Sequence, residues 1–292
     1  MIQALTGMAT PFLIAALGGL FTERAGVLNI ALEGLMLIAA FTSVTVAGQT
    51  GSLLMGLTAG IAASTLSALF FAEVSLRLRA NIFIAGLAIN LFASGITTLI
   101  SKAVFDTKGV LEFDSFPSPS SISIPLLSDI PLIGAVFSDQ TAFTYFGLLL
   151  VPVSMYLLYR SPFGMRIRAA GLDEAALYVR GVSPLRIRIT ALTISGFACG
   201  IAGASIAIPL GAYVPHITAG RGWIALVAIF LGYKRPVGIL AASLIFAAAE
   251  WVSYTVQGSG AVPSTLLLGA PFFITFTGMV IFSAVSFALK RR

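Results

Sequence analysis

The chain has 292 residues, of which 58% are hydrophobic and 10% are charged. Soluble domains carry about 25% charged residues, so this composition excludes a soluble protein and indicates a polytopic α-helical membrane protein. The net charge of +6 does not indicate nucleic-acid binding, because the basic residues are distributed along the chain as membrane topology requires.

Several apolar stretches have lengths near the ~20 residues that a membrane-spanning helix needs. We place the spans near 3–22, 30–48, 52–75, 82–100, 142–159, 189–209, 222–233, 237–256 and 263–287. The seventh stretch is short, and a tight loop separates it from the eighth. We therefore expect an all-α protein in which residues 1–292 form a single transmembrane domain of about nine helices.

The lysine and arginine residues predict the orientation of these spans. With the basic C-terminal residues 290–292 placed in the cytoplasm, the spans alternate back to an N-terminus outside the cell. Only three of the 17 basic residues then lie on the outer side, namely Lys102, Lys108 and Arg221. This asymmetry agrees with the excess of basic residues found in cytoplasmic loops.

The longest outer segment, 101–141, contains several prolines and acids. Its apolar part, IPLLSDIPLIGAVF, is too interrupted by proline to span the membrane, so we expect it to lie along the outer interface. There it would either cap a pathway or receive an external partner, and a merely variable loop is the alternative.

The cytoplasmic segment 160–188 is rich in arginine and predicts a short helix at 172–180. Acids at its start and a base at its end complement the helix dipole, and a glycine follows: Asp173, Glu174, Arg180 and Gly181. Ser183 and Pro184 then restart a helix as N-cap and first residue. A capped cytoplasmic helix suits contact with another protein, whereas a solvated loop is the alternative.

The sequence offers little support for catalysis. It has no GxxxxGK[ST] phosphate-binding motif, and its single histidine, His216, and single cysteine, Cys199, form no catalytic or metal-binding set. We therefore expect a transport protein that binds no cofactor itself.

Polar residues within the predicted spans are better candidates for function. Asn29 and Glu33 are four residues apart and are expected on one helix face, while Asn90 lies in the middle of the fourth span. Glu250 lies in the eighth span, near its outer end. Such groups face either a water-filled pathway or a neighbouring helix to which they bond, and both alternatives remain open.

Five stretches in order along the chain resemble permease subunits of ABC importers for nucleosides and simple sugars, within the branched-chain amino acid and ribose permease family. They are ERAGVLNIALEGLMLIAAF, NIFIAGLAINLFASGI, LSDIPLIGAVF, SPFGMRIRAAGLDEAALYVRGV and AGRGWIALVAIFLGYKRPVG. The ribose-type members have an Asp where this chain has Asn29 and no acid at Glu33, so the chain is more similar to the nucleoside-type branch.

The resemblance implies a type II ABC importer permease fold in a bacterial cytoplasmic (inner) membrane, with the first of ten spans missing. It implies that Asn29, Glu33 and Asn90 belong to the substrate pathway. It also implies a coupling helix that docks in an ATPase, with these candidate residues: Arg168, Gly171, Asp173, Glu174, Ala175, Ala176 and Arg180.

The implied partners are a second permease, as a paralogue or a copy, an ATPase that holds ATP and Mg, and an external binding lipoprotein. A nucleoside is the first choice of substrate, followed by simple sugars or a flavin such as riboflavin. An ion-coupled secondary transporter is the alternative of another class, but it would not need the helix at 172–180.

Overall fold

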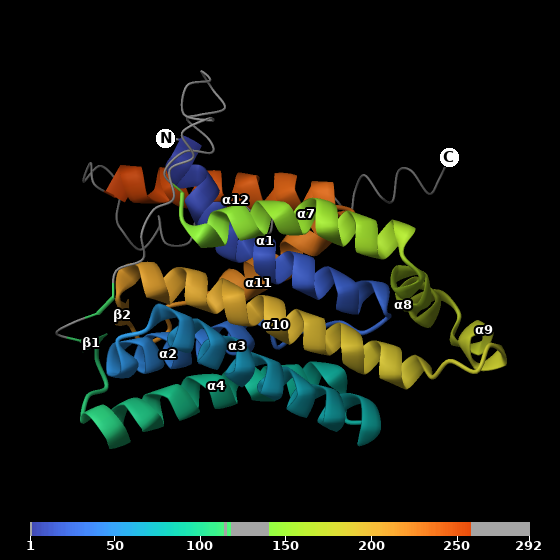
Figure 1. Ribbon diagram of the computed structural model, residues 1–292, viewed down its shortest axis with the longest axis horizontal. Helices are drawn as coiled ribbons and strands as arrows, with labels where there is room; N and C mark the ends of the chain where they lie inside the picture. The colour runs from blue at the N-terminus through green and yellow to red at the C-terminus, as the bar shows by residue number, and fades with distance from the viewer. Residues whose placement is uncertain (1, 114–115, 118–139, 258–292) are drawn as a thin grey trace.

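The computed structural model describes residues 2–113, 116–117 and 140–257. Seven helices in this part of the chain are long and apolar enough to cross a membrane, and they run roughly parallel (Figure 1). They are α1 (Ile2–Arg24), α2 (Leu32–Thr50), α3 (Leu53–Ala72), α4 (Ile82–Phe105), α7 (Ala142–Arg160), α10 (Pro184–Leu210) and α12 (Pro236–Gln257). A five-residue π-helical turn, η1 (Glu73–Arg77), prolongs α3. The predicted span at 263–287 lies outside the described residues, as does the apolar stretch predicted to follow the outer interface.

Helix α11 (Arg221–Leu231) differs from these spans because it has only 11 residues. At a rise of 1.5 Å per residue it is about half as long as a bilayer crossing requires. The sequence already indicated that this span is short. The crossing that contains α11 is therefore discontinuous, because residues 214–220 lead to α11 without forming a helix.

The short elements lie at opposite ends of the bundle (Figure 1). At one end β1 (Leu111–Glu112) pairs antiparallel with β2 (Ala212–Tyr213). At the other end α8 (Pro162–Leu172) and α9 (Glu174–Val179) form an elbow between α7 and α10. The segment 160–188, which was expected on the cytoplasmic side, forms this elbow.

Three helices form the centre of the bundle. Their most apolar segments are 78% buried in α1, 67% in α2 and 72% in α10, against 22–44% in α3, α4, α7 and α12. Small residues on α10 allow close contact, since a Cβ at Gly200 would lie 2.6 Å from the Cα of Ile61 on α3. Close backbone approach of this kind drives helix association in lipid, where the hydrophobic effect between helices is absent.

The starts of α2 and α10 differ from those placed by hydropathy. Helix α2 begins at Leu32 because the chain turns at Gly26, whose φ is +77°, and continues without a helix to residue 31. Helix α10 begins at Pro184 rather than near 189, as the Ser183–Pro184 pair predicted. Proline suits the first helical position because its missing N–H would have no partner there.

Helix α8 was not predicted. It begins at Pro162 after the N-cap Ser161, whose side chain accepts a hydrogen bond from the Gly164 N–H. The signal was in the sequence, because Ser161–Pro162 repeats the Ser183–Pro184 pair. The prediction for 160–188 placed a helix only at 172–180, with a solvated loop as the alternative.

Candidate functional site

The start of α2 is joined to the start of α11 through the carboxylate of Glu33. Its Oε1 accepts hydrogen bonds from the Thr218 hydroxyl at 2.6 Å and the Gly220 N–H at 2.9 Å, and its Oε2 accepts one from the Gly222 N–H at 2.7 Å. The first N–H groups of a helix have no partner within that helix, and the positive end of its dipole attracts a carboxylate. Glu33 therefore completes the N-terminus of α11 from another part of the chain.

Glycine at position 222 makes this contact possible. A Cβ there would overlap the backbone N and Cα of Glu33. Two helix N-termini thus meet inside the bundle, one after the non-helical segment 25–31 and the other after 214–220. Broken helices whose N-termini point inward are characteristic of substrate sites in transporters.

Asn90 on α4 contacts the non-helical segment 25–31, which we call the break before α2. Its Nδ2 donates to the Ile30 carbonyl at 3.0 Å, and its Oδ1 accepts a hydrogen bond from the Gly34 N–H at 2.7 Å. Gly34 also has no room for a side chain, because a Cβ would lie 2.9 Å from the Asn90 Cα. Asn90 therefore satisfies one backbone donor and one acceptor at the start of α2.

Asn29 lies within the break and is only 1% exposed. Its Oδ1 accepts a hydrogen bond from the Ala31 N–H at 3.0 Å, and its Nδ2 donates to the hydroxyl of Ser195 on α10 at 2.9 Å. The expectation that Asn29 and Glu33 share one helix face is wrong, since α2 begins only at Leu32. Both residues still hold the same break, and Ser195 is a partner that the sequence did not reveal.

A second charged group belongs to α11 and α12. Arg221, the first residue of α11, forms an ion pair with Glu250, and the Tyr254 hydroxyl donates to Glu250 Oε1 at 3.3 Å. The two charged side chains are only 17% and 13% exposed, so each needs the other to offset its loss of hydration. Glu250 is thus bonded between helices, the second of the two alternatives raised for polar residues in the spans.

At the elbow formed by α8 and α9, Asp173 is the N-cap of α9. Its Oδ1 accepts hydrogen bonds from the Ala175 N–H at 3.0 Å and the Ala176 N–H at 3.4 Å. Gly181 follows the helix with a φ of +69°, as the sequence predicted. The carboxylate of Asp173 therefore caps its own helix through Oδ1 and leaves Oδ2 for an external donor.

Arg188 on α10 connects this elbow to the break before α2. Its Nη1 lies 2.9 Å from Glu174 Oε2 in an ion pair, its Nη2 donates to the Ala170 carbonyl at 3.1 Å, and its Nε donates to the Ala25 carbonyl at 3.3 Å. One guanidinium thus binds α9, α8 and the residue that follows α1. The sequence had shown Arg188 only as one of several cytoplasmic arginines.

The other residues proposed for coupling differ in their surroundings. Gly171 is exposed but has no room for a side chain, since a Cβ there would meet the backbone of Arg24 and Gly26. Arg168 lies over the ring of Tyr159, with its Cζ 5.5 Å from the ring centroid. The remaining coupling candidates are exposed: Glu174, Ala175, Ala176 and Arg180.

Three large apolar side chains at this elbow are also exposed. Leu172 is 87% exposed, Tyr178 is 64% exposed and Val179 is 89% exposed. Apolar side chains gathered at the polar end of a membrane protein commonly mark a surface for another protein. We call Leu172, Tyr178 and Val179 the elbow patch.

Known proteins resemble the chain over most of its length. Residues 1–283 match the model of a family described as branched-chain amino acid transport system permease components. The guanosine ABC transporter permease protein NupQ of Bacillus subtilis is 35% identical over 285 residues, which cover 93% of this chain and 88% of that protein. The nucleoside ABC transporter permease protein NupC of Lactococcus lactis is 30% identical over 293 residues, which cover 97% and 92%.

A solved structure shares the fold. It is an inward-facing conformation of a metal-chelate type ABC transporter, with a TM-score of 0.53 and 16% sequence identity, and the match covers 94% of this chain and 84% of that one.

Proposed function

Because the chain belongs to the family of branched-chain amino acid transport system permease components, it is a multi-pass permease subunit of an ABC transporter in the bacterial inner membrane, and we propose that it transports a nucleoside. The names of the two relatives, one a guanosine and one a nucleoside permease, support this substrate. Membership of an ABC transporter family excludes the alternative of an ion-coupled secondary transporter, because ABC permeases are driven by an ATPase.

We propose that the translocation route passes the junction where the start of α2 meets the start of α11. The observation that carries this proposal is the carboxylate of Glu33, which joins the N-termini of α2 and α11, each of which follows a non-helical segment. Glu33 and Asn90 are partly exposed and would border the route, whereas the buried Asn29 would brace its wall. Polar groups at such a position suit a solute that carries hydroxyl and ring-nitrogen groups.

ABC permeases in general work with an ATPase and a substrate-binding protein. We propose that α9 and the elbow patch seat in the ATPase, which would hold the ATP and Mg. A movement of α9 would displace Glu174 and, through their ion pair, Arg188. Arg188 would transmit this displacement to the Ala25 carbonyl, which lies at the start of the break before α2. A second permease would complete the pathway, and an external lipoprotein would deliver the substrate.

This arrangement requires the elbow in the cytoplasm and the β1–β2 end outside. We propose this orientation from the distribution of basic residues. With Cys199 replaced, cysteines introduced at Arg180 and at Lys108, both exposed, should react oppositely with an impermeant thiol reagent. Labelling of position 180 from outside intact cells would show that the protein has the opposite orientation.

Uptake by the complete transporter tests the substrate. Cells that express the chain with its binding protein, ATPase and second permease should accumulate labelled guanosine, and unlabelled nucleosides should compete with it. Glucose and riboflavin should not compete. Competition by glucose or riboflavin alone would assign the transporter to a sugar or a flavin.

Insertion of bulk at the elbow tests the docking role. Ala175→Trp should prevent close approach of the ATPase, so the ATPase should no longer copurify with the permease. Thr190→Trp, which adds the same side chain at an exposed position of α10, is the control. If the two variants bind the ATPase equally well, α9 is not the docking helix.

A further inference from the structure

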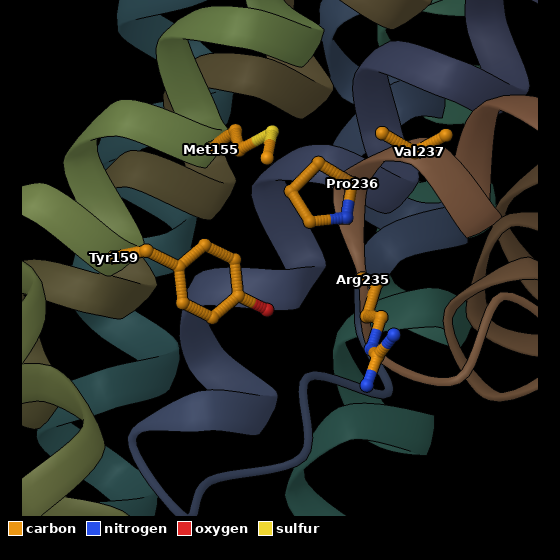
Figure 2. Close-up of a pocket in the computed structure, with 5 residues that line it drawn as sticks. All are labelled: Met155, Tyr159, Arg235, Pro236 and Val237. Atoms are coloured by element: carbon orange, nitrogen blue, oxygen red, sulfur yellow. The ribbon is translucent and has the colours of Figure 1, made fainter.

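A groove opens between α7 and the start of α12, near the elbow. It encloses about 370 Å³ and is lined by Met155, Tyr159, Arg235, Pro236 and Val237. Figure 2 shows that these side chains are sorted by polarity, with Met155 and Val237 toward one end and the Tyr159 hydroxyl and Arg235 guanidinium toward the other. The groove is therefore amphipathic along its length.

The polar end carries positive charge without matching acids. Arg24 donates from Nη2 to the Tyr159 hydroxyl at 3.3 Å, and the Arg168 guanidinium lies over the Tyr159 ring. Lys234 is paired with Glu23, but among the described residues Arg24, Arg168 and Arg235 form no ion pair. Three guanidinium groups thus surround or adjoin Tyr159 with no carboxylate to neutralise them.

One of these arginines also has an unused donor. Nε of Arg168 is buried and donates to no atom of the described residues. A buried donor without an acceptor is costly, and an anion with several oxygen atoms is the usual partner for clustered arginines. Arg168 does not line the groove itself, so the polar end favours an anionic ligand through Arg235, while Arg24 and Arg168 add positive charge beside Tyr159.

The apolar end selects the kind of anion. Met155 and Val237 are 50% and 58% exposed and lie on two helices that are long enough to span the membrane. A ligand whose charge lies at Arg235 and whose body extends along these residues must carry an apolar chain. Anionic phospholipids meet both conditions, and basic pockets between transmembrane helices near the cytoplasmic surface bind such headgroups.

We propose that this groove binds an anionic phospholipid, with its phosphate near Arg235 and the Tyr159 hydroxyl and its acyl chain against Met155 and Val237. Tyr159 also bonds to Arg24, which donates to the Lys234 carbonyl from Nε at 3.2 Å. The lipid would thereby contact the network that connects α1, α7 and the α11–α12 turn. Its binding does not depend on which solute the transporter carries.

Native mass spectrometry of the assembled transporter tests the site. The probes are phosphatidylglycerol and phosphatidylcholine with identical acyl chains, and the variants are Arg235→Gln and Arg186→Gln. Arg186 is exposed on α10 at the same end of the molecule, so both variants remove one positive charge, but only the first lies in the groove. The wild type should prefer phosphatidylglycerol.

Arg235→Gln should weaken phosphatidylglycerol binding about fivefold, the loss expected for one basic contact with an anionic lipid. Phosphatidylcholine binding and the Arg186→Gln variant should be unchanged. Equal losses in the two variants would overturn the proposal, because general surface charge would then explain the preference.

Two further results would also overturn it. Displacement of phosphatidylglycerol by inorganic phosphate would show a site for a free phosphate rather than a lipid. Loss of the ATPase from Arg235→Gln in lipid-free detergent would show that the groove is an ATPase contact.

Discussion

The break before α2 and the elbow of α8 and α9 use the same chemistry in different surroundings. In both, a carboxylate accepts two backbone N–H groups at the start of a short helix, Glu33 for α11 and Asp173 for α9. Glu33 reaches a helix almost 190 residues away in sequence, whereas Asp173 caps the helix that directly follows it. The first contact determines the tertiary structure, and the second determines only a local conformation.

The two regions also differ in what remains unpartnered. At the break, Asn29 and Asn90 each bond to partners within the chain through both ends of their amide groups. At the elbow, the capped helix leaves the elbow patch exposed. The bonded groups at the break suit the proposed translocation route, and the exposed elbow patch suits the proposed docking surface. Arg188 contacts both regions.

The largest expected effect is at the break. Glu33→Ala should abolish most uptake, because two backbone N–H groups and the Thr218 hydroxyl lose their acceptor. Each buried donor left unpaired costs about 1–3 kcal/mol. Uptake, thermal stability and copurification with the ATPase should be measured together.

Glu73→Ala is the control for this variant, since Glu73 pairs with Arg77 on the surface, where an ion pair contributes little. Glu33→Gln should retain part of the activity because its amide oxygen still accepts hydrogen bonds. Normal uptake by Glu33→Ala would show that the junction of α2 and α11 is not needed for transport.

The second-largest effect is expected at the ion pair of Arg188 and Glu174, where substitution of Arg188 should reduce coupling more than substitution of Glu174. Arg188→Gln loses most of three contacts with Glu174, Ala170 and Ala25, whereas Glu174→Gln loses only the charge of one. Substrate should therefore stimulate ATP hydrolysis much less in Arg188→Gln, while Glu174→Gln should remain close to the wild type. This difference should appear in reconstituted vesicles with basal ATP hydrolysis unchanged.

Equal loss of stimulation in the two variants would show that the ion pair alone carries the coupling. An Arg188→Gln variant that responds normally to substrate would remove Arg188 from the connection between the elbow and the break.

The smallest effect should be at the cap of α9. Asp173→Ala removes the acceptor for the Ala175 and Ala176 N–H groups and should destabilise this helix by about 0.5–2 kcal/mol. Asp173→Ser, which keeps an N-cap acceptor, should restore most of the affinity for the ATPase. Weakened binding in both variants would indicate that the charge of Asp173 itself contacts the partner.

Local patterns in the sequence determined much of the architecture. Hydropathy located all seven long helices and the shortness of α11, because burial in lipid requires continuous apolar stretches. The acids, the base and the glycine around 172–180 located α9 to within two residues of its start, since caps depend on neighbouring residues. Asn29, Glu33 and Asn90 could be selected as unusual polar residues in apolar surroundings.

Only the tertiary structure decided what these residues bind. The partners that Glu33, Asn29 and Arg188 bind on other elements lie between 14 and 189 residues away in sequence, and no local periodicity encodes such pairs. The prediction that Asn29 lies on a helix was wrong for the same reason. Asn90 and Ser195 stabilise a non-helical backbone there, which a hydropathy pattern does not detect. Helix propensity acts over a few neighbouring residues, whereas a break in a membrane helix exists only where other helices supply its hydrogen bonds.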